Sequence, residues 1–250
     1  MKTILLVLVF FSSSFCLCQE VERQFEEANQ LYRIGEYEKA ATAYEQILKN
    51  GYETASLYYN LGNAYFKANN LPAAILNYER AHRIAPSDDD ISYNLRLSNL
   101  HVADKIEPVP KLFFVEWWQA LTNAYSSDIW AMILVGCLWL VPATVCSVVV
   151  AHSQTLRRIL SALALLGITV FILSTIGTVQ RFRIESAENV AILFQASSYV
   201  KSSPDDRSTD LFVLHEGVKV EILDTVESWK KIRLVDGKVG WIPSSALRII

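Results

Sequence analysis

The sequence contains few of the residues that usually carry catalysis or bind metals. It has four cysteines and four histidines among 250 residues, and the histidines are scattered over different segments. Two cysteines lie near the N-terminus and two lie inside a long hydrophobic run, which supports neither a disulfide framework nor a zinc site. No Gly-x-Ser-x-Gly elbow and no phosphate-binding loop is present. We therefore expect a protein that is not an enzyme, with no catalytic residues, no metal and no cofactor.

The chain also lacks an excess of positive charge. Its net charge is −3, and residues 19–110 hold 14 acidic and 9 basic side chains. A nucleic-acid partner is not expected, because binding phosphates requires clustered lysine and arginine. Hydrophobic residues instead make up 52% of the chain, which argues against a fully soluble protein.

Two long hydrophobic runs, Ile129–Ala151 and Ile159–Val179, carry no charged residue. About 20 apolar residues in a helix cross a hydrocarbon core of ~30 Å, so each run is long enough to span a lipid bilayer. Only His152–Arg158 separates them, which predicts a hairpin that enters the membrane and returns. Neither run carries an ionisable group that would indicate an ion or proton path.

Residues 1–18 have the pattern of an export signal peptide. Lys2 precedes the apolar stretch Ile4–Phe11, which is too short to span a membrane, and we expect cleavage after Cys18. An exported N-terminal part places the hairpin turn, with Arg157 and Arg158, in the cytoplasm. The predicted location is the bacterial inner membrane, crossed twice, with the N-terminal and C-terminal domains periplasmic.

Residues 21–88 repeat with a period of 34. Ala28 and Gly62 are 34 residues apart, and the same spacing joins the pairs Leu31 and Tyr65, Ala40 and Ala74, and Tyr44 and Tyr78. Two helices approach closely where one offers glycine or alanine and an aromatic ring fills the space opposite. The pattern resembles the tetratricopeptide repeat, with units at 21–54 and 55–88. Arg96, 34 residues after Gly62, is too large for such an approach, so we expect the helix at 88–104 to cap a domain spanning 19–104.

Such repeats usually bind extended peptides or helices on the concave face formed by the first helix of each unit. By register, the candidate partner-binding residues are Phe25, Asn29, Tyr32, Tyr59, Asn63, Phe66, Tyr93 and Leu97. Asn29 and Asn60 match two positions of the clamp with which this family binds a C-terminal carboxylate. The basic residues of that clamp are absent. As an alternative to partner binding, the aromatic side chains of this face pack within the stack.

The segment 105–128 links the repeats to the membrane. It places Phe113, Phe114, Trp117, Trp118 and Leu121 largely along one side of a helix. Because aromatic rings prefer the headgroup level of a bilayer, we expect this segment to lie at the membrane surface. Packing against the repeat domain is the alternative.

After residue 186 the pattern changes to short strands separated by turns. The order Tyr199-Val-Lys-Ser-Ser-Pro, Leu214-His-Glu-Gly, Ser228-Trp-Lys-Lys-Ile and Gly240-Trp-Ile-Pro resembles a bacterial SH3-type domain, which implies a small closed barrel over 186–250. Tyr199, Trp229 and Trp241 are candidate contacts for a peptide or a cell-wall glycan. The two tryptophans equally fit a role in covering one end of the barrel core, and His215 is expected to be solvated or bonded locally.

The expected fold class is a multi-domain membrane protein with a tetratricopeptide array, a two-helix transmembrane hairpin and a small all-β barrel. This order, with Asp90–Leu97, Asp104-Lys-Ile-Glu-Pro and Trp117–Trp118, resembles the BatE-type proteins of the Bacteroides aerotolerance operon. That resemblance implies an envelope complex with von Willebrand factor A-type membrane proteins and a MoxR-type ATPase. We expect a non-enzymatic scaffold with two periplasmic interaction modules. The alternatives are an envelope anchor whose SH3-type domain binds peptidoglycan, and a sensor of envelope stress.

Overall fold

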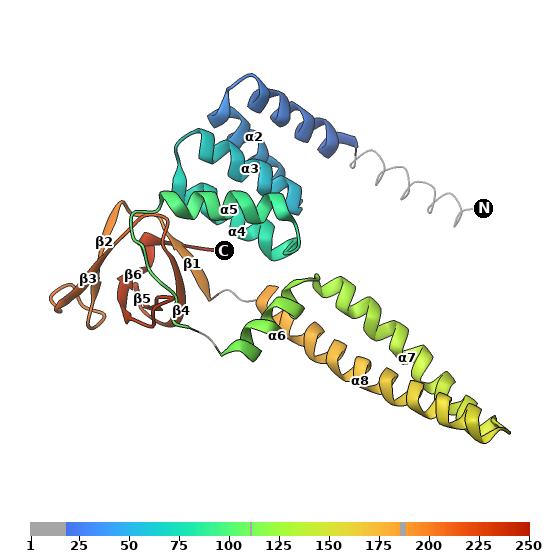
Figure 1. Cartoon of the computed structure of the whole chain (residues 1–250). Coiled ribbons are helices and arrows are strands. Elements are labelled where there is room, and N and C mark those ends of the chain that lie inside the picture. Colours follow the sequence, from blue (N-terminus) through green and yellow to red (C-terminus); the bar gives the residue numbers. More distant parts are fainter. Residues whose placement is uncertain (1–18, 111, 186–188) are drawn as a thin grey trace, which may run out of the picture. The chain divides into compact units, whose positions relative to one another are not determined.

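The computed structural model describes residues 19–110, 112–185 and 189–250 (Figure 1). The expected signal peptide at 1–18 lies outside the described residues. The chain divides into two compact units. Of the described residues, the array–barrel unit contains 19–82, 88–109 and 189–250, and the hairpin unit contains 83–87, 110 and 112–185.

The N-terminal half of the array–barrel unit is a stack of antiparallel helices. A helix covers the described residues 19–33 and is followed by α2 (Tyr37–Lys49), α3 (Ala55–Lys67), α4 (Leu71–Ile84) and α5 (Asp89–His101). Side chains before α3 and α5 cap these helices: Thr54 Oγ1 accepts the amide N–H of Leu57, and the Asp88 carboxylate accepts two amides of the first turn.

Small residues let these helices pack closely. A Cβ added to Gly62 of α3 would lie 2.7 Å from Cδ1 of Tyr78 in α4, so only glycine fits against that ring. Ala28, Ala40 and Ala64 are fully buried in the core of the first repeat. The close approach of glycine or alanine to an aromatic ring is the packing that the 34-residue pattern predicts.

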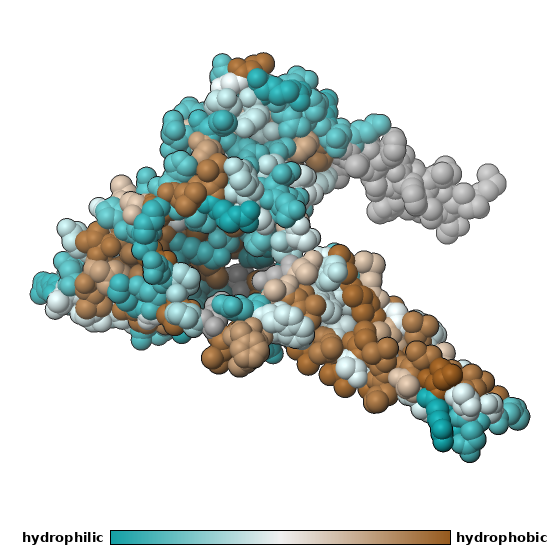
Figure 2. Space-filling model, viewed as in Figure 1, coloured by the Kyte–Doolittle hydropathy of each residue, from teal (hydrophilic) through white to brown (hydrophobic). Residues whose placement is uncertain are grey.

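The hairpin unit contains α6 (Phe113–Asn123), α7 (Ser127–Val150) and α8 (Gln154–Glu185). Two helical stretches, Ser127–Val150 and Gln154–Ile184, are long and apolar enough to cross a membrane. Helix α8 starts five residues before the expected span, so Arg157 and Arg158 belong to its first turns rather than to the loop. Figure 2 shows hydrophobic residues along most of the hairpin and hydrophilic residues at the end where α7 turns into α8.

Two glycines of α8 allow α7 to approach closely. A Cβ at Gly177 would lie 2.9 Å from the ring of Trp130, and one at Gly167 would lie 3.0 Å from Val141. Trp130 is buried and donates its indole N–H to the carbonyl oxygen of Thr122. Close packing over small residues is how helices associate in a medium without a hydrophobic driving force.

The C-terminal half of the array–barrel unit is an antiparallel sheet. Its strands run in the order β3-β2-β6-β5-β4-β1-β7. The sheet confirms the expected all-β class, but within the described residues no strand pairing joins its edge strands β3 and β7, so the expected closure by hydrogen bonds is not observed. We keep the name barrel for this domain. The short strand β7 was not among the strands expected from the sequence. The elements are β1 (Val190–Leu193), β2 (Ser197–Lys201), β3 (Asp210–His215), β4 (Lys219–Val226), β5 (Trp229–Arg233), β6 (Val239–Pro243), a 3-10 turn η1 (Ser244–Ala246) and β7 (Leu247–Ile249).

Candidate functional site

Asparagine side chains connect the helices of the repeat stack. Asn29 Oδ1 accepts a hydrogen bond from the Tyr44 hydroxyl at 2.6 Å and another from the Asn60 amide at 3.1 Å. One repeat later, Asn63 Oδ1 accepts from the Tyr78 hydroxyl at 2.7 Å and from the Asn94 amide at 2.9 Å. We call the four residues Asn29, Asn60, Asn63 and Asn94 the asparagine ladder. The two sets of bonds are identical and lie 34 residues apart.

Burial of the tyrosine rings raises their pKa values. Burial, reinforced by the neighbouring Tyr32, raises the pKa of Tyr44 to about 12. The pKa of Tyr78 rises further above its usual value, again chiefly because the ring is buried. Both hydroxyls therefore stay protonated at neutral pH and donate to the ladder.

Two cavities lie along the ladder. The smaller, about 120 Å³, lies between Asn29, Tyr32 and Asn60, and the larger, about 260 Å³, lies between Tyr59, Phe66 and Asn94. Tyr32 and Asn63 border both cavities. Together the two cavities, which we call the groove, have aromatic walls and a floor of amide and hydroxyl groups that are largely hydrogen-bonded to one another.

Six of the eight residues expected on the concave face border this groove: Asn29, Tyr32, Tyr59, Asn63, Phe66 and Leu97. Phe25 instead packs against the core of the first repeat, with its ring centroid 5.8 Å from that of Tyr44. Tyr93 is exposed and borders neither cavity.

Six other lining residues were not among the sequence candidates: Arg33, Tyr44, Lys67, Tyr78, Asn94 and Ser98. The period of 34 could have identified most of them, because it relates Tyr44 to Tyr78, Arg33 to Lys67 and Asn60 to Asn94. The sequence pattern predicts packing of the tyrosine rings. The tyrosine hydroxyls and asparagine amides also form hydrogen bonds that repeat with the same period.

The ladder leaves little for a carboxylate clamp. The Asn60 amide donates to Asn29, and the Asn94 amide donates to both Asn63 and the Tyr59 hydroxyl. Arg33, the basic residue beside the smaller cavity, is paired with Glu26 at 2.5 Å. The geometry therefore offers few free donors for a terminal carboxylate.

The three candidate ligand contacts of the barrel have different surroundings. Trp229 is only 9% exposed, which matches a role in covering the barrel core. Trp241 is partly exposed, with Lys231 Nζ 5.9 Å from its ring centroid. Tyr199 is 57% exposed and pairs with Val213 across β2 and β3. Tyr199 and Trp241 are therefore open to a ligand, and Trp229 is largely closed to one.

His215 has a distant partner rather than a local one. The Asp104 carboxylate accepts a hydrogen bond from the backbone amide of His215 at 2.6 Å and lies 2.9 Å from its ring Nδ1. The His215 side chain is 45% exposed, so the expectation of a solvated histidine is met in part. The expectation of a local bonding partner was wrong, because Asp104 is 111 residues away. Among residues 19–110, 112–185 and 189–250, no group of three or more His, Cys, Asp or Glu is placed to hold a metal ion.

Comparisons with known proteins identify two domains. Residues 25–89 match a tetratricopeptide repeat model, and residues 196–248 match a bacterial SH3 domain model. No curated protein matches the chain. Both kinds of domain are typically non-enzymatic modules for protein interaction, and the SH3 type is also associated with peptidoglycan binding. The chain therefore combines a tetratricopeptide domain, two helices suited to a membrane and a bacterial SH3 domain.

Proposed function

We propose that the protein is a non-enzymatic scaffold in the bacterial inner membrane, anchored by α7 and α8, with its interaction domains in the periplasm. The observation that carries the proposal is the groove along the asparagine ladder. Its aromatic walls and amide floor fit an extended segment of another protein, and none of its residues forms a catalytic arrangement. The resemblance to BatE-type proteins suggests partners of the von Willebrand factor A type, linked to a MoxR-type ATPase.

The test is crosslinking from inside the groove in intact cells. A photoreactive residue at Tyr59 or Phe66 should capture other membrane or periplasmic proteins, because both side chains border the larger cavity. The same residue at Glu38, an exposed position in α2, is the matched control. Identical products from Phe66 and Glu38, or products from neither, would contradict a binding role for the groove.

Binding of peptidoglycan by the barrel is a second candidate function. It is supported by the exposure of Tyr199 and Trp241, since aromatic rings commonly stack on sugar rings. Solubilised full-length protein should bind purified wall material, and Tyr199→Ala and Trp241→Ala should weaken that binding. Trp229→Ala is a poor probe, because loss of this buried ring would destabilise the barrel itself by about 3–5 kcal/mol. Unchanged wall binding by both exposed-site variants would exclude this surface.

A further inference from the structure

The repeat array and the barrel share one hydrophobic core, although residues 110–188 separate them in the chain. Ile75 and Leu76 of α4 and Val102 after α5 belong to the same buried cluster as Leu193 and Val218 of the barrel. Gly217 of the barrel lies against the array: a Cβ added there would be 3.1 Å from Cγ2 of Val102 and 3.2 Å from Cδ1 of Ile75. The array and the barrel are therefore in van der Waals contact at this point, beside a cavity of about 390 Å³ that Val102, Gly217 and Val218 also line.

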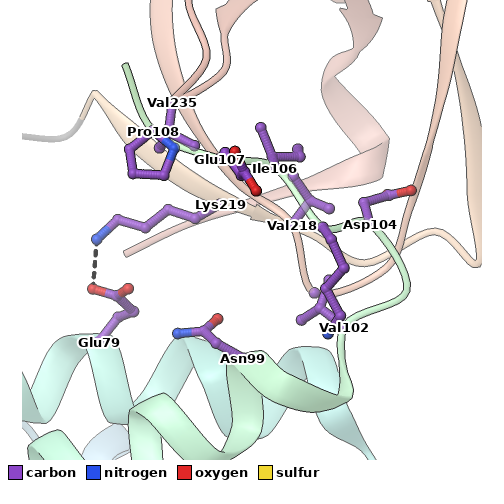
Figure 3. A pocket seen from close by; sticks show the side chains of 12 residues that line it. Glu79, Asn99, Val102, Asp104, Ile106, Glu107, Pro108, Val218, Lys219 and Val235 are labelled. Atoms are coloured by element: carbon purple, nitrogen blue, oxygen red, sulfur yellow. Dashed lines mark hydrogen bonds and ion pairs between the residues drawn. The ribbon is translucent and has the colours of Figure 1, made fainter. Parts of the chain in front are cut away.

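Polar contacts surround this shared core. Glu79 of α4, which is only 8% exposed, pairs with Lys219 of β4 at 2.7 Å. Arg80 donates to the carbonyl oxygen of Ile249 at 2.9 Å, and Asp104 binds His215 as described above. Figure 3 shows Glu79 and Asn99 on the helices facing Lys219 and Val218 across a cavity of about 390 Å³, which the ion pair spans. A buried carboxylate is costly unless it is paired, so Glu79 depends on the barrel.

Backbone hydrogen bonds to the barrel fix the chain near residue 109, where it leaves the array–barrel unit, and near residue 189, where it returns. The Val109 amide donates to the carbonyl oxygen of Val235, and the Ile222 amide donates to the carbonyl oxygen of Asn189 at 2.6 Å. The ends of the segment that contains the hairpin are therefore both fixed by backbone hydrogen bonds to barrel residues.

A third repeat would place its second helix against α5 and α4. Arg96 prevents a close helix approach at the position that corresponds to Gly62, and the barrel instead packs on Ile75, Leu76 and Leu95. The surface that would accept another repeat is thus already covered by a domain encoded after the membrane hairpin.

We infer that the array and the barrel are one extramembrane module into which the hairpin is inserted, with the SH3-type domain acting as the terminal cap of the tetratricopeptide stack. The inference rests on the proposed membrane anchoring and adds that both domains must lie on the same side of the bilayer, because a shared core cannot form across it. The partner of the array's open end is therefore this chain's own barrel. External ligands are left with the groove along the asparagine ladder and the exposed residues Tyr199 and Trp241.

A disulfide across the shared core tests this inference in the full-length protein. The native cysteines are replaced by alanine, Val102→Cys is combined with Gly217→Cys, and a protease site is inserted in the turn at 151–153. After oxidation in membranes and cleavage, the two fragments should remain joined on a non-reducing gel and separate on reduction. Fragments that separate without reductant would overturn the inference.

Gly237 supplies the matched control for this pair. Gly217 and Gly237 have almost the same positive φ, +88° and +89°, but nothing lies within 4 Å of a Cβ at Gly237. Val102→Cys with Gly237→Cys therefore carries the same backbone strain and should give no joined product. Equal joining in both pairs would show non-specific oxidation and would overturn the inference.

A charge exchange provides a second measurement that needs no cysteine. Glu79→Lys or Lys219→Glu alone should increase the rate of proteolysis in 103–110 roughly tenfold by opening the interface, and the double variant should return it to within about twofold of the native rate. A double variant as sensitive as the single variants would contradict the shared interface. Neither the disulfide experiment nor the charge exchange involves a partner protein. A negative result in either would therefore contradict the shared core without affecting the proposed binding groove, and a negative crosslinking result would contradict the groove without affecting the shared core.

Discussion

At the scale of single residues, Asn63 connects three helices. Its side-chain oxygen in α3 accepts from Tyr78 in α4 and Asn94 in α5. Because this acceptor is partly buried and serves two donors, its removal leaves both without their partner. Asn63 also borders both groove cavities, so the same side chain links the stability of the stack to the shape of the proposed binding surface.

Asn63→Ala should lower the free energy of unfolding of the array by about 1–3 kcal/mol, the cost of leaving buried donors unsatisfied. Chemical denaturation of the solubilised protein, followed by helical circular dichroism, measures this change. Glu38→Ala, at an exposed position in α2 away from the ladder, should change stability by less than about 0.5 kcal/mol. Equal effects of the two substitutions would show that the ladder bonds contribute nothing specific.

The buried tyrosines make the array sensitive to alkali. Burial raises the pKa of Tyr44 to about 12, and the pKa of Tyr65 and of Tyr78 is also raised. A tyrosine ionises near pH 10 in the unfolded chain, so its buried protonated form stabilises the fold below pH 10. That stabilisation should be lost as the pH rises from about 10 through about 12.

Parallel titrations of tyrosinate absorbance and helical circular dichroism measure this loss. Helix content should fall together with the ionisation of the buried tyrosines, and Tyr44→Phe should reduce the steepness of the fall. Complete ionisation at pH 10 with the helices intact would contradict the burial of these hydroxyls.

At the scale of elements, α7 and α8 pack through the contact between Gly177 and Trp130. Gly177→Leu should force the helices apart at this point and lower the stability of the hairpin by about 1–3 kcal/mol. Gly136→Leu is the matched control, because nothing lies within 4 Å of a Cβ at Gly136. The thermal midpoint of the detergent-solubilised protein should decrease for the first variant only.

The aromatic helix α6 is joined to the same pair of helices at one residue. Trp118 donates its indole N–H to the side chain of Gln180 in α8 at 2.6 Å, whereas Phe113, Phe114 and Trp117 remain exposed. One side of α6 is therefore anchored within the hairpin unit, and the exposed rings suit the headgroup level of a bilayer. The position of the segment at the membrane surface stays a prediction.

The elements that sequence analysis predicted well are those defined by local patterns. The period of 34 predicts the contact of Gly62 with Tyr78, and the lack of charge predicts α7 and α8. Strand β7 was missed because three residues are too short for a detectable alternation, and its pairing with β1 is what defines it. The Asp104–His215 and Glu79–Lys219 pairs were missed because no sequence period relates residues that lie on either side of the helical hairpin formed by α7 and α8.

At the scale of the whole molecule, the shared core changes how the two interaction domains are to be studied. A fragment of residues 186–250 would lack Ile75, Leu76 and Val102, which the array contributes to the buried cluster shared with the barrel. Loss of wall binding by such a fragment would then report misfolding rather than the absence of a ligand site. The array likewise needs Lys219 as the partner for the buried Glu79.

A chain in which a flexible linker of about 12 residues replaces 110–188 tests this coupling. Such a linker has a root-mean-square reach of roughly 20 Å. We expect one cooperative unfolding transition, with coincident midpoints for helical circular dichroism and for tryptophan fluorescence, which reports the barrel through Trp229 and Trp241.

Gly217→Val should separate the two midpoints by placing a side chain against Val102, while Gly237→Val, with the same backbone strain and open space around it, should leave them coincident. Two independent transitions in the parent chain would show that the array and the barrel fold separately. If the two midpoints coincide in the parent chain and in Gly237→Val but separate in Gly217→Val, the contact between Gly217 and Val102 couples the folding of the array to that of the barrel.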